Sequence, residues 1–206
     1  MIVGALLLAG GSGRRMGANK LALPVDGVPM LVRAHAALAE AGLPALLVTG
    51  AHDEELRALL PGVPHVHAAR HAEGLSASIA AGVAAAPADW GALLVVLGDM
   101  PFVRPETHRA LAGVLAQGAP AVQPVCEGRP GNPAGFARAH FGDLRALRGD
   151  RGARALLRAP WVRRVPVDDP GIHADIDTPD ALARAARAPA SAPLHVGVGR
   201  GQANLD

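Results

Sequence analysis

The residues best suited to chemistry stand in one short segment near the N-terminus, residues 6–20, which reads LLLAGGSGRRMGANK. Three glycines and three cations follow an apolar run there: Gly10, Gly11, Gly13, Arg14, Arg15 and Lys20. Glycine lets backbone N–H groups approach an anion without an intervening Cβ, and the cations add positive charge to the same loop. The segment therefore predicts a polyphosphate-binding loop, with a plain glycine turn carrying solvated arginines as the alternative.

Two better-known phosphate loops do not fit this segment. A Walker loop places glycine directly before its lysine and Ser or Thr directly after it, but here Asn19 precedes Lys20 and Leu21 follows. The dinucleotide fingerprint G-x-G-x-x-G also fails, because Gly17 comes one residue too late after Gly11 and Gly13.

Lys20 is the only lysine in a chain whose other cations are all arginine. A lysine is a compact point charge on a flexible stem, whereas arginine is a planar fork. A lysine can therefore reach between the oxygens of adjacent phosphates, where a guanidinium is too broad. This composition indicates that Lys20 contacts the phosphates.

Carboxylates in two other segments could hold a metal ion. Asp99 follows the apolar run ending at Leu97, and Asp175 and Asp177 stand in the segment HADIDTPDAL. Mg²⁺ takes one or two carboxylates together with phosphate oxygens and water, so Asp99 is the first candidate. Side chains two residues apart are separated by one that points to the opposite side of an extended chain, and we expect at most one of Asp175 and Asp177 to share the metal ion with Asp99. Each acid could instead favour the N-terminus of a helix.

Histidine and cysteine give a weaker signal. His65, His67 and His71 resemble a zinc site only loosely, because no cysteine pair or fourth ligand accompanies them, and we interpret them as surface or packing residues. The single cysteine, Cys126, excludes an internal disulfide framework and fits a reducing, cytoplasmic location. We give Cys126 no catalytic role.

Alternating strands and helices position these residues. Apolar runs predict strands at Ile2–Leu8, Ala45–Thr49, Val63–Ala68, Ala92–Leu97, Ala121–Val125 and Val162–Val167. Helical patterns occupy Pro29–Ala41, Asp53–Leu60, Ser76–Ala86, Pro105–Gln117, Ala137–Leu147, Gly152–Arg158 and Thr178–Arg187, with Ser76 or Ser78 expected as a cap. This alternation predicts a three-layer α/β fold with a doubly wound, mostly parallel sheet, in which ligands bind beyond the carboxyl ends of the strands.

Composition narrows the classes of partner. Half of the 206 residues are hydrophobic and the formal net charge is only +2, with no dense Lys/Arg run, so nucleic acid and membrane surfaces are not expected partners. The apolar N-terminus lacks a positive leader and is too short to span a bilayer. Residues 1–187 are expected to form one domain, and Pro, Ser and Gly in residues 188–206 predict a flexible tail.

The chain resembles the nucleotidyltransferases that attach a nucleotide to molybdopterin, above all the molybdenum cofactor cytidylyltransferases. The resemblance rests on six segments in family order: LLLAGGSGRRMGANKLALPVDGVPML, EGLSASIAAG, LGDMPFV, GRPGNPAGF, GDRGARALL and DIDTPDAL. It implies a Rossmann-like sheet of the nucleotide-diphospho-sugar transferase type that binds CTP and Mg²⁺. The phosphate of the molybdenum-loaded pterin would attack the α-phosphorus of CTP and expel pyrophosphate.

The same resemblance implies a role for each matching residue. The backbone from Leu8 and Ala9 to Gly11 would hold base and ribose, Arg15 and Lys20 the triphosphate, and Asp99 the magnesium ion. Ser78 would contact the nucleotide near its base, unless it is a plain helix cap. The loop Gly128–Phe136 would line the acceptor pocket with Asn132 and Pro133, while Asp177 or Asp175 would complete the metal or pterin side.

One departure from the cytidylyl pattern leaves open which nucleotide base the protein uses. Cytidylyl members usually carry Ala-Ala-Gly where this chain has Ala9-Gly10-Gly11, and this form resembles the guanylyl branch, which uses GTP. The segments GLSAS, GNP and DIDTP resemble the cytidylyl branch. A transferase for another phosphorylated acceptor is a further alternative. A non-catalytic chaperone that delivers the finished cofactor to a molybdoenzyme is the alternative from another class, and retention of Lys20 and Asp99 argues against it.

Overall fold

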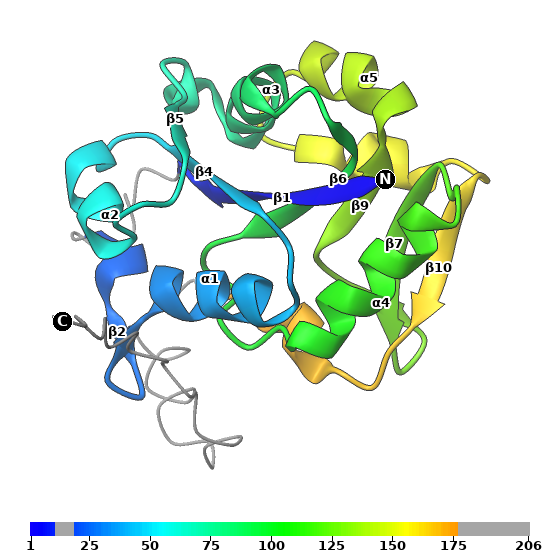
Figure 1. The fold of residues 1–206 in the computed structure, drawn as a ribbon, viewed down its shortest axis with the longest axis horizontal. Helices are drawn as coiled ribbons and strands as arrows, with labels where there is room; N and C mark the ends of the chain where they lie inside the picture. The colour runs from blue at the N-terminus through cyan, green and yellow to red at the C-terminus, as the bar shows by residue number, and fades with distance from the viewer. Residues whose placement is uncertain (11–18, 177–206) are drawn as a thin grey trace, which may run out of the picture.

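A computed structural model of the chain describes residues 1–10 and 19–176. An eight-stranded sheet runs through its middle in the order β10-β7-β9-β6-β1-β4-β5, with β8 paired to β7 (Figure 1). The strands are β1 Ile2–Ala9, β4 Ala45–Thr49, β5 His65–His67, β6 Trp90–Leu97, β7 Ala121–Cys126, β8 Arg129–Pro130, β9 Ala134–Ala137 and β10 Val162–Pro166. A separate two-stranded hairpin joins β2 Pro24–Val25 to β3 Val28–Pro29.

Helices cover both faces of this sheet. They are α1 Met30–Glu40, α2 Asp53–Leu59, α3 Leu75–Ala85, α4 Pro105–Ala116 and α5 Phe141–Ala146. Short 3₁₀ helices are η1 Lys20–Ala22, η2 His71–Glu73, η3 Arg138–His140, η4 Gly152–Arg158 and η5 Pro170–His173. Figure 1 shows α3 and α5 on one face and α1 and α4 on the other, which is the three-layer fold that the sequence predicts.

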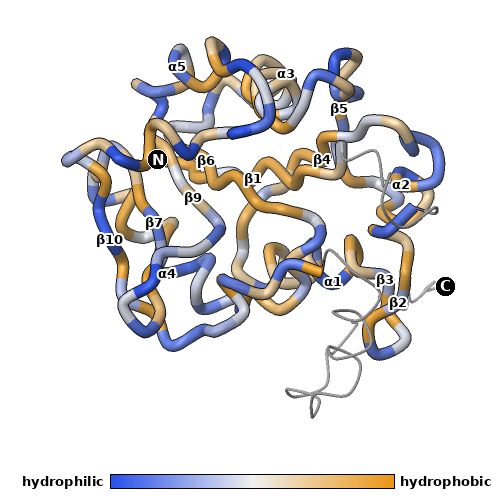
Figure 2. The backbone as a smooth tube through the Cα atoms, turned by 180° about the vertical axis from the view of Figure 1, so that it is seen from behind, coloured by the Kyte–Doolittle hydropathy of each residue, from blue (hydrophilic) through white to orange (hydrophobic). Residues whose placement is uncertain are grey.

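Strand β1 is the centre of the core. It pairs in parallel with β4 on one side and β6 on the other, and the register aligns Leu8 with both Val48 and Leu97. Its side chains alternate between two hydrophobic clusters, with Leu7 packing among residues of α1 and α4 and Leu6 among residues of α3 and α5. A continuous apolar run is required because both faces are covered, and Figure 2 shows the hydrophobic colour along β1 and β6.

The helix predicted to begin at Ser76 begins one residue earlier in the structure. The helix begins at Leu75 and its N-cap is Gly74, which has a φ of +110°. Ser76 and Ser78 therefore lie inside the first turns, and both are buried. The expectation that one of them caps the helix is wrong, because the preceding glycine makes the sharp turn.

The segment Gly128–Phe136, expected as a loop, contains strand β8 and the first three residues of β9. Strand β9 lies between β6 and β7 and is antiparallel to both, which makes the sheet mixed. Its position depends on Gly135, since a Cβ there would come within 2.7 Å of Leu94, Leu115 and Val122. Four residues reading AGFA give no clear strand signal, so only the tertiary packing defines this strand.

The expected helix Thr178–Arg187 and the expected flexible tail at 188–206 lie outside the described residues, so the domain boundary at 187 stays a prediction. The helices within residues 1–10 and 19–176 include none with the length and apolar character that a membrane crossing needs.

Candidate active site

The carboxyl ends of β1, β4 and β6 meet at one edge of the sheet, and the predicted site residues gather there. Gly10 follows β1, Gly50 follows β4, and Gly98 and Asp99 follow β6. The backbone N–H of Gly98 donates to the carbonyl of Leu8 at 3.0 Å, which holds the two strand ends together. A Cβ at Gly98 would lie 3.0 Å from that same carbonyl oxygen, so glycine suits this close approach.

Lys20 and Asp99 face each other at this edge. The Lys20 Nζ donates to Asp99 Oδ2 at 2.9 Å, and their side chains are 13% and 26% exposed. Lys20 begins η1, and Asp99 leaves β6 after Gly98, so two segments far apart in the sequence deliver the opposite charges. The pairing shows that one edge of the sheet presents both an ammonium group and a carboxylate.

The segment before Asp177 also reaches this edge. The backbone N–H of Ile176 donates to the carbonyl of Asp99 at 3.1 Å, which places Asp175 and Ile176 beside the end of β6. Buried Asp169 anchors the segment at its other end, because its carboxylate accepts from Arg104 N at 2.9 Å, Thr107 Oγ at 2.6 Å and Gly171 N at 2.9 Å.

Asn132 and Pro133 lie at the same edge. Strand β9 runs antiparallel to β6 with Ala134 opposite Val95, so the residues before Ala134 lie toward the carboxyl end of β6. The peptide bond between Asn132 and Pro133 is cis. Asn132 N donates to the carbonyl of Ile172 at 3.0 Å, which joins this pair to the segment carrying Asp175.

A tight cluster surrounds Gly10. A Cβ at Gly10 would clash with Ser78 Oγ, and a Cβ at Gly50 would lie 2.7 Å from the Gly10 carbonyl oxygen. Ser78 is buried and projects from α3 toward the end of β1. The glycines therefore allow the backbone at the ends of β1 and β4 to pack closely together and against Ser78. The side chains of Leu8 and Ala9 are buried in the core, so only their backbone could serve a ligand.

Five of the predicted site residues, Gly11, Gly13, Arg14, Arg15 and Asp177, lie outside the described residues. Their proposed roles remain predictions.

Three residues near this edge were not singled out from the sequence as site residues. Gly50 could have been found, because it follows a predicted strand as Gly10 does. Asn19 is buried and its Nδ2 has no hydrogen-bond partner in the described structure. His71 was interpreted as a surface or packing residue, and its ring does pack against Gly50, beside the predicted site. At the end of β4, the Thr49 hydroxyl donates to Asp53 and holds the pKa of that carboxyl below its ordinary value.

Asp99 is a candidate ligand for a divalent cation at this edge. Within residues 1–10 and 19–176, no group of three or more His, Cys, Asp or Glu side chains is placed to bind a metal. Asp99 supplies a hard carboxylate oxygen, which is the donor type that Mg²⁺ and Mn²⁺ accept. Mg²⁺ usually takes few protein ligands and shares phosphate oxygens of the substrate, so this donor set fits a metal that arrives with a triphosphate.

A mostly parallel sheet with glycines, a lysine and an aspartate at its carboxyl edge defines an α/β nucleotidyltransferase. Residues 5–167 match the MobA-like NTP transferase domain, and the chain belongs to that family. Residues 5–167 therefore form an NTP transferase domain.

Solved structures and curated proteins agree with this assignment. Rv0371c from Mycobacterium tuberculosis H37Rv is 28% identical, with a TM-score of 0.81 over 90% of this chain and 98% of that one. Molybdopterin-guanine dinucleotide biosynthesis protein A from Archaeoglobus fulgidus is 25% identical, with a TM-score of 0.67 over 90% of this chain and 96% of that one. The bifunctional protein GlmU of Geobacter metallireducens is 35% identical over 140 residues, which are 65% of this chain and 29% of that protein. The chain thus spans less than a third of that curated relative.

Proposed function

We propose that the protein transfers CMP from CTP to the phosphate of molybdopterin in the molybdenum cofactor, with Mg²⁺, and releases pyrophosphate. The observation that carries the proposal is the 2.9 Å approach of Lys20 Nζ to Asp99 Oδ2 at the carboxyl edge of the sheet. That edge offers both charges that a metal-bound triphosphate needs. The segments GLSAS, GNP and DIDTP favour the cytidylyl reaction, and the related guanylyl reaction with GTP is the second candidate because of Ala9-Gly10-Gly11.

In this reaction the chain supplies position and charge rather than a covalent intermediate. An oxygen of the acceptor phosphate bonds to the α-phosphorus as the bond from that phosphorus to the pyrophosphate oxygen breaks. Lys20, with Arg14 and Arg15, would hold the triphosphate and neutralise the charge that grows on the leaving pyrophosphate. The backbone at Gly10 and the Ser78 side chain would hold the nucleoside.

Asp99 would be the first protein ligand of the metal, with Asp177 as the second carboxylate because it follows Ile176, whose N–H binds the Asp99 carbonyl. A bound cation would supply positive charge that makes the α-phosphorus more electrophilic. Mn²⁺ is an alternative to Mg²⁺, since a structure of Rv0371c, 25% identical over 91% of this chain, is described as a complex with manganese.

The acceptor would occupy the neighbouring part of the edge. Asn132, Pro133 and Asp175 lie there on segments joined by the hydrogen bond from Asn132 to Ile172. Their place beside Asp99 supports the acceptor role, because the attacking phosphate would have to reach the α-phosphorus of the nucleotide. A recipient molybdoenzyme, or its chaperone, would then take the product.

The test is a comparison of four nucleotides. The pure protein is incubated with CTP, GTP, UTP or ATP, with Mg²⁺ or Mn²⁺ and with molybdenum cofactor, and both pyrophosphate and the dinucleotide product are measured. We expect both products with CTP. Turnover with GTP alone would overturn the cytidylyl assignment, and turnover with none of the four would overturn the molybdopterin acceptor.

A further inference from the structure

The ring of His71 lies against the glycines at the end of the central strands. A Cβ at Gly50 would come within 2.9 Å of the His71 ring carbon Cγ, and a Cβ at Gly10 would lie 3.8 Å from His71 Cβ. His71 is partly exposed, so the side chain is not enclosed in the core. The imidazole therefore lies at the carboxyl ends of β1 and β4, packed beside Gly10 and Gly50.

The hydrogen bond of this ring fixes which nitrogen carries the proton. His71 Nδ1 lies 3.0 Å from the carbonyl oxygen of Ala68. A carbonyl oxygen can only accept, so Nδ1 is the protonated nitrogen and donates. In the neutral imidazole, Nε2 then has a free lone pair and acts as an acceptor. No hydrogen bond to Nε2 is found within residues 1–10 and 19–176.

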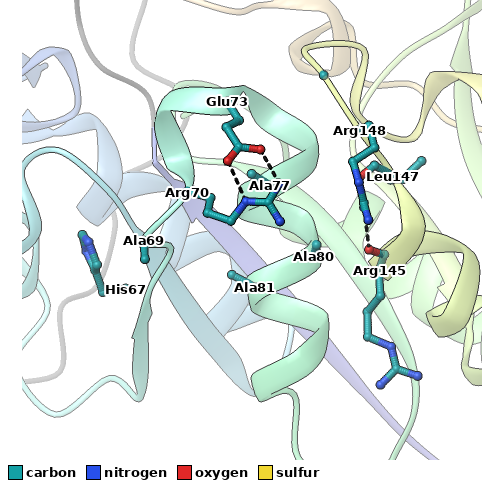
Figure 3. A pocket seen from close by; sticks show the side chains of 11 residues that line it. His67, Ala69, Arg70, Glu73, Ala77, Ala80, Ala81, Arg145, Leu147 and Arg148 are labelled. Atoms are coloured by element: carbon teal, nitrogen blue, oxygen red, sulfur yellow. Dashed lines mark hydrogen bonds and ion pairs between the residues drawn. The ribbon is translucent and has the colours of Figure 1, made fainter.

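The turn that carries His71 is held in place before any ligand binds. Ala68 N donates to the Thr49 carbonyl at 2.9 Å, which ties the start of the turn to β4. Arg70 makes two hydrogen bonds to Glu73, at 2.6 and 2.5 Å, across η2 (Figure 3). Figure 3 also shows that His67, Arg70 and Glu73 line a separate pocket beside α3. The preceding histidine thus borders a different space from His71.

We infer that His71 reads the nucleotide base: its Nε2 accepts a hydrogen bond from an exocyclic amino group. Cytosine carries such a group at position 4, where uracil carries a carbonyl oxygen that would meet the Nε2 lone pair unfavourably. Guanine likewise carries a 2-amino group that hypoxanthine lacks. This inference rests on the proposed function in taking the base to lie beside Gly10, and it makes His71 a specificity determinant.

The test measures discrimination rather than rate. We would determine kcat/KM and, by calorimetry, the Kd of CTP and UTP with Mg²⁺, or of GTP and ITP if GTP is the substrate. His71→Phe keeps a planar ring and removes the acceptor. We expect it to lower the preference for the amino-bearing base about tenfold, because one hydrogen bond is lost from that base and, in the case of UTP, one repulsion is also relieved.

His67→Phe is the matched control. The ring centroids of His67 and His71 lie 5.8 Å apart, with the rings edge to face, but His67 lines the pocket of Figure 3. This variant should therefore keep the wild-type ratio of the two nucleotides' kcat/KM and Kd values. A purely structural role of His71 would weaken both nucleotides equally, and an unchanged ratio in His71→Phe, with an unchanged melting temperature, would overturn the inference. If the wild-type protein releases no pyrophosphate, the proposed function fails, while the ratio of Kd values still tests His71.

Discussion

The ammonium group of Lys20 lies 2.9 Å from the carboxylate of Asp99, although the two residues are 79 positions apart in the chain. Each group is the natural partner of one half of a metal-bound triphosphate: the ammonium of its phosphates, the carboxylate of its cation. In the proposed reaction the ion pair therefore opens when substrate binds, and each group then contacts its half of the metal-bound triphosphate. Without substrate, each group neutralises the charge of the other in a partly buried site.

Substitution of either partner should remove catalysis and leave the fold intact. We expect Lys20→Met and Asp99→Asn each to lower pyrophosphate release about 10²-fold or more, because each removes a charge that acts on the reacting phosphates. The side chains are partly exposed, so the free energy of unfolding should change by only about 1 kcal/mol. Steady-state kinetics and urea unfolding measure the two effects.

Glu106→Gln is the control for this pair of variants. It breaks the ion pair between Arg109 Nη2 and Glu106 Oε1, 2.6 Å apart on the exposed face of α4. This variant should keep wild-type pyrophosphate release. Wild-type release from either Lys20→Met or Asp99→Asn would contradict the placement of the site at this edge.

Substitution of Gly50, in the turn after β4, should weaken nucleotide binding. In Gly50→Ala the new Cβ would lie 2.7 Å from the Gly10 carbonyl oxygen and 2.9 Å from Gly10 Cα, so backbone has to move. We expect the Kd for nucleotide to rise about tenfold by calorimetry. Gly142→Ala, where nothing lies within 4 Å of the added Cβ, should leave the Kd unchanged. Equal affinities in both variants would show that Gly10 does not contact the nucleotide.

The sequence predicts the elements whose patterns are local and misses those set by packing. The apolar run at Ala45–Thr49 agrees with β4 at both ends, and the run after Met1 extends one residue further than expected, to Ala9. Strand β9 was missed because Phe136 and its small neighbours carry no alternation, and its place depends on side chains of β6, β7 and α4 around Gly135. The contact between Gly50 and His71 could not be predicted from the sequence either, because neither residue type indicates which residue packs against it.

That packing at Gly135 makes a prediction for stability. A Cβ at this position would lie 2.7 Å from atoms of three fully buried side chains, Leu94, Leu115 and Val122. We expect Gly135→Ala to lower the free energy of unfolding by about 1–3 kcal/mol, because the core has no room for the methyl group. Gly113→Ala on α4 meets nothing within 4 Å and should instead raise it by up to about 1 kcal/mol. Urea unfolding of both variants would show opposite signs, and a shared sign would contradict this account.

His108 predicts how stability depends on pH. The side chain is buried on α4, its Nδ1 has no hydrogen-bond partner in the described structure, and burial lowers its pKa to about 4 although Asp169 opposes the shift. The unfolded chain, with a histidine pKa near 6.5, binds more protons between these values. The stabilisation from neutral His108 is therefore fully present above about pH 6.5 and is lost as the pH falls toward 4.

The size of this loss follows from the shift, which corresponds to roughly 3 kcal/mol. The drop in unfolding free energy between pH 7 and pH 4 should therefore be smaller by that amount in His108→Leu than in the wild-type protein. His65→Gln changes an exposed histidine and should keep the wild-type drop. An identical drop in His108→Leu and wild type, measured by urea unfolding at both pH values, would show that His108 is not held neutral by burial.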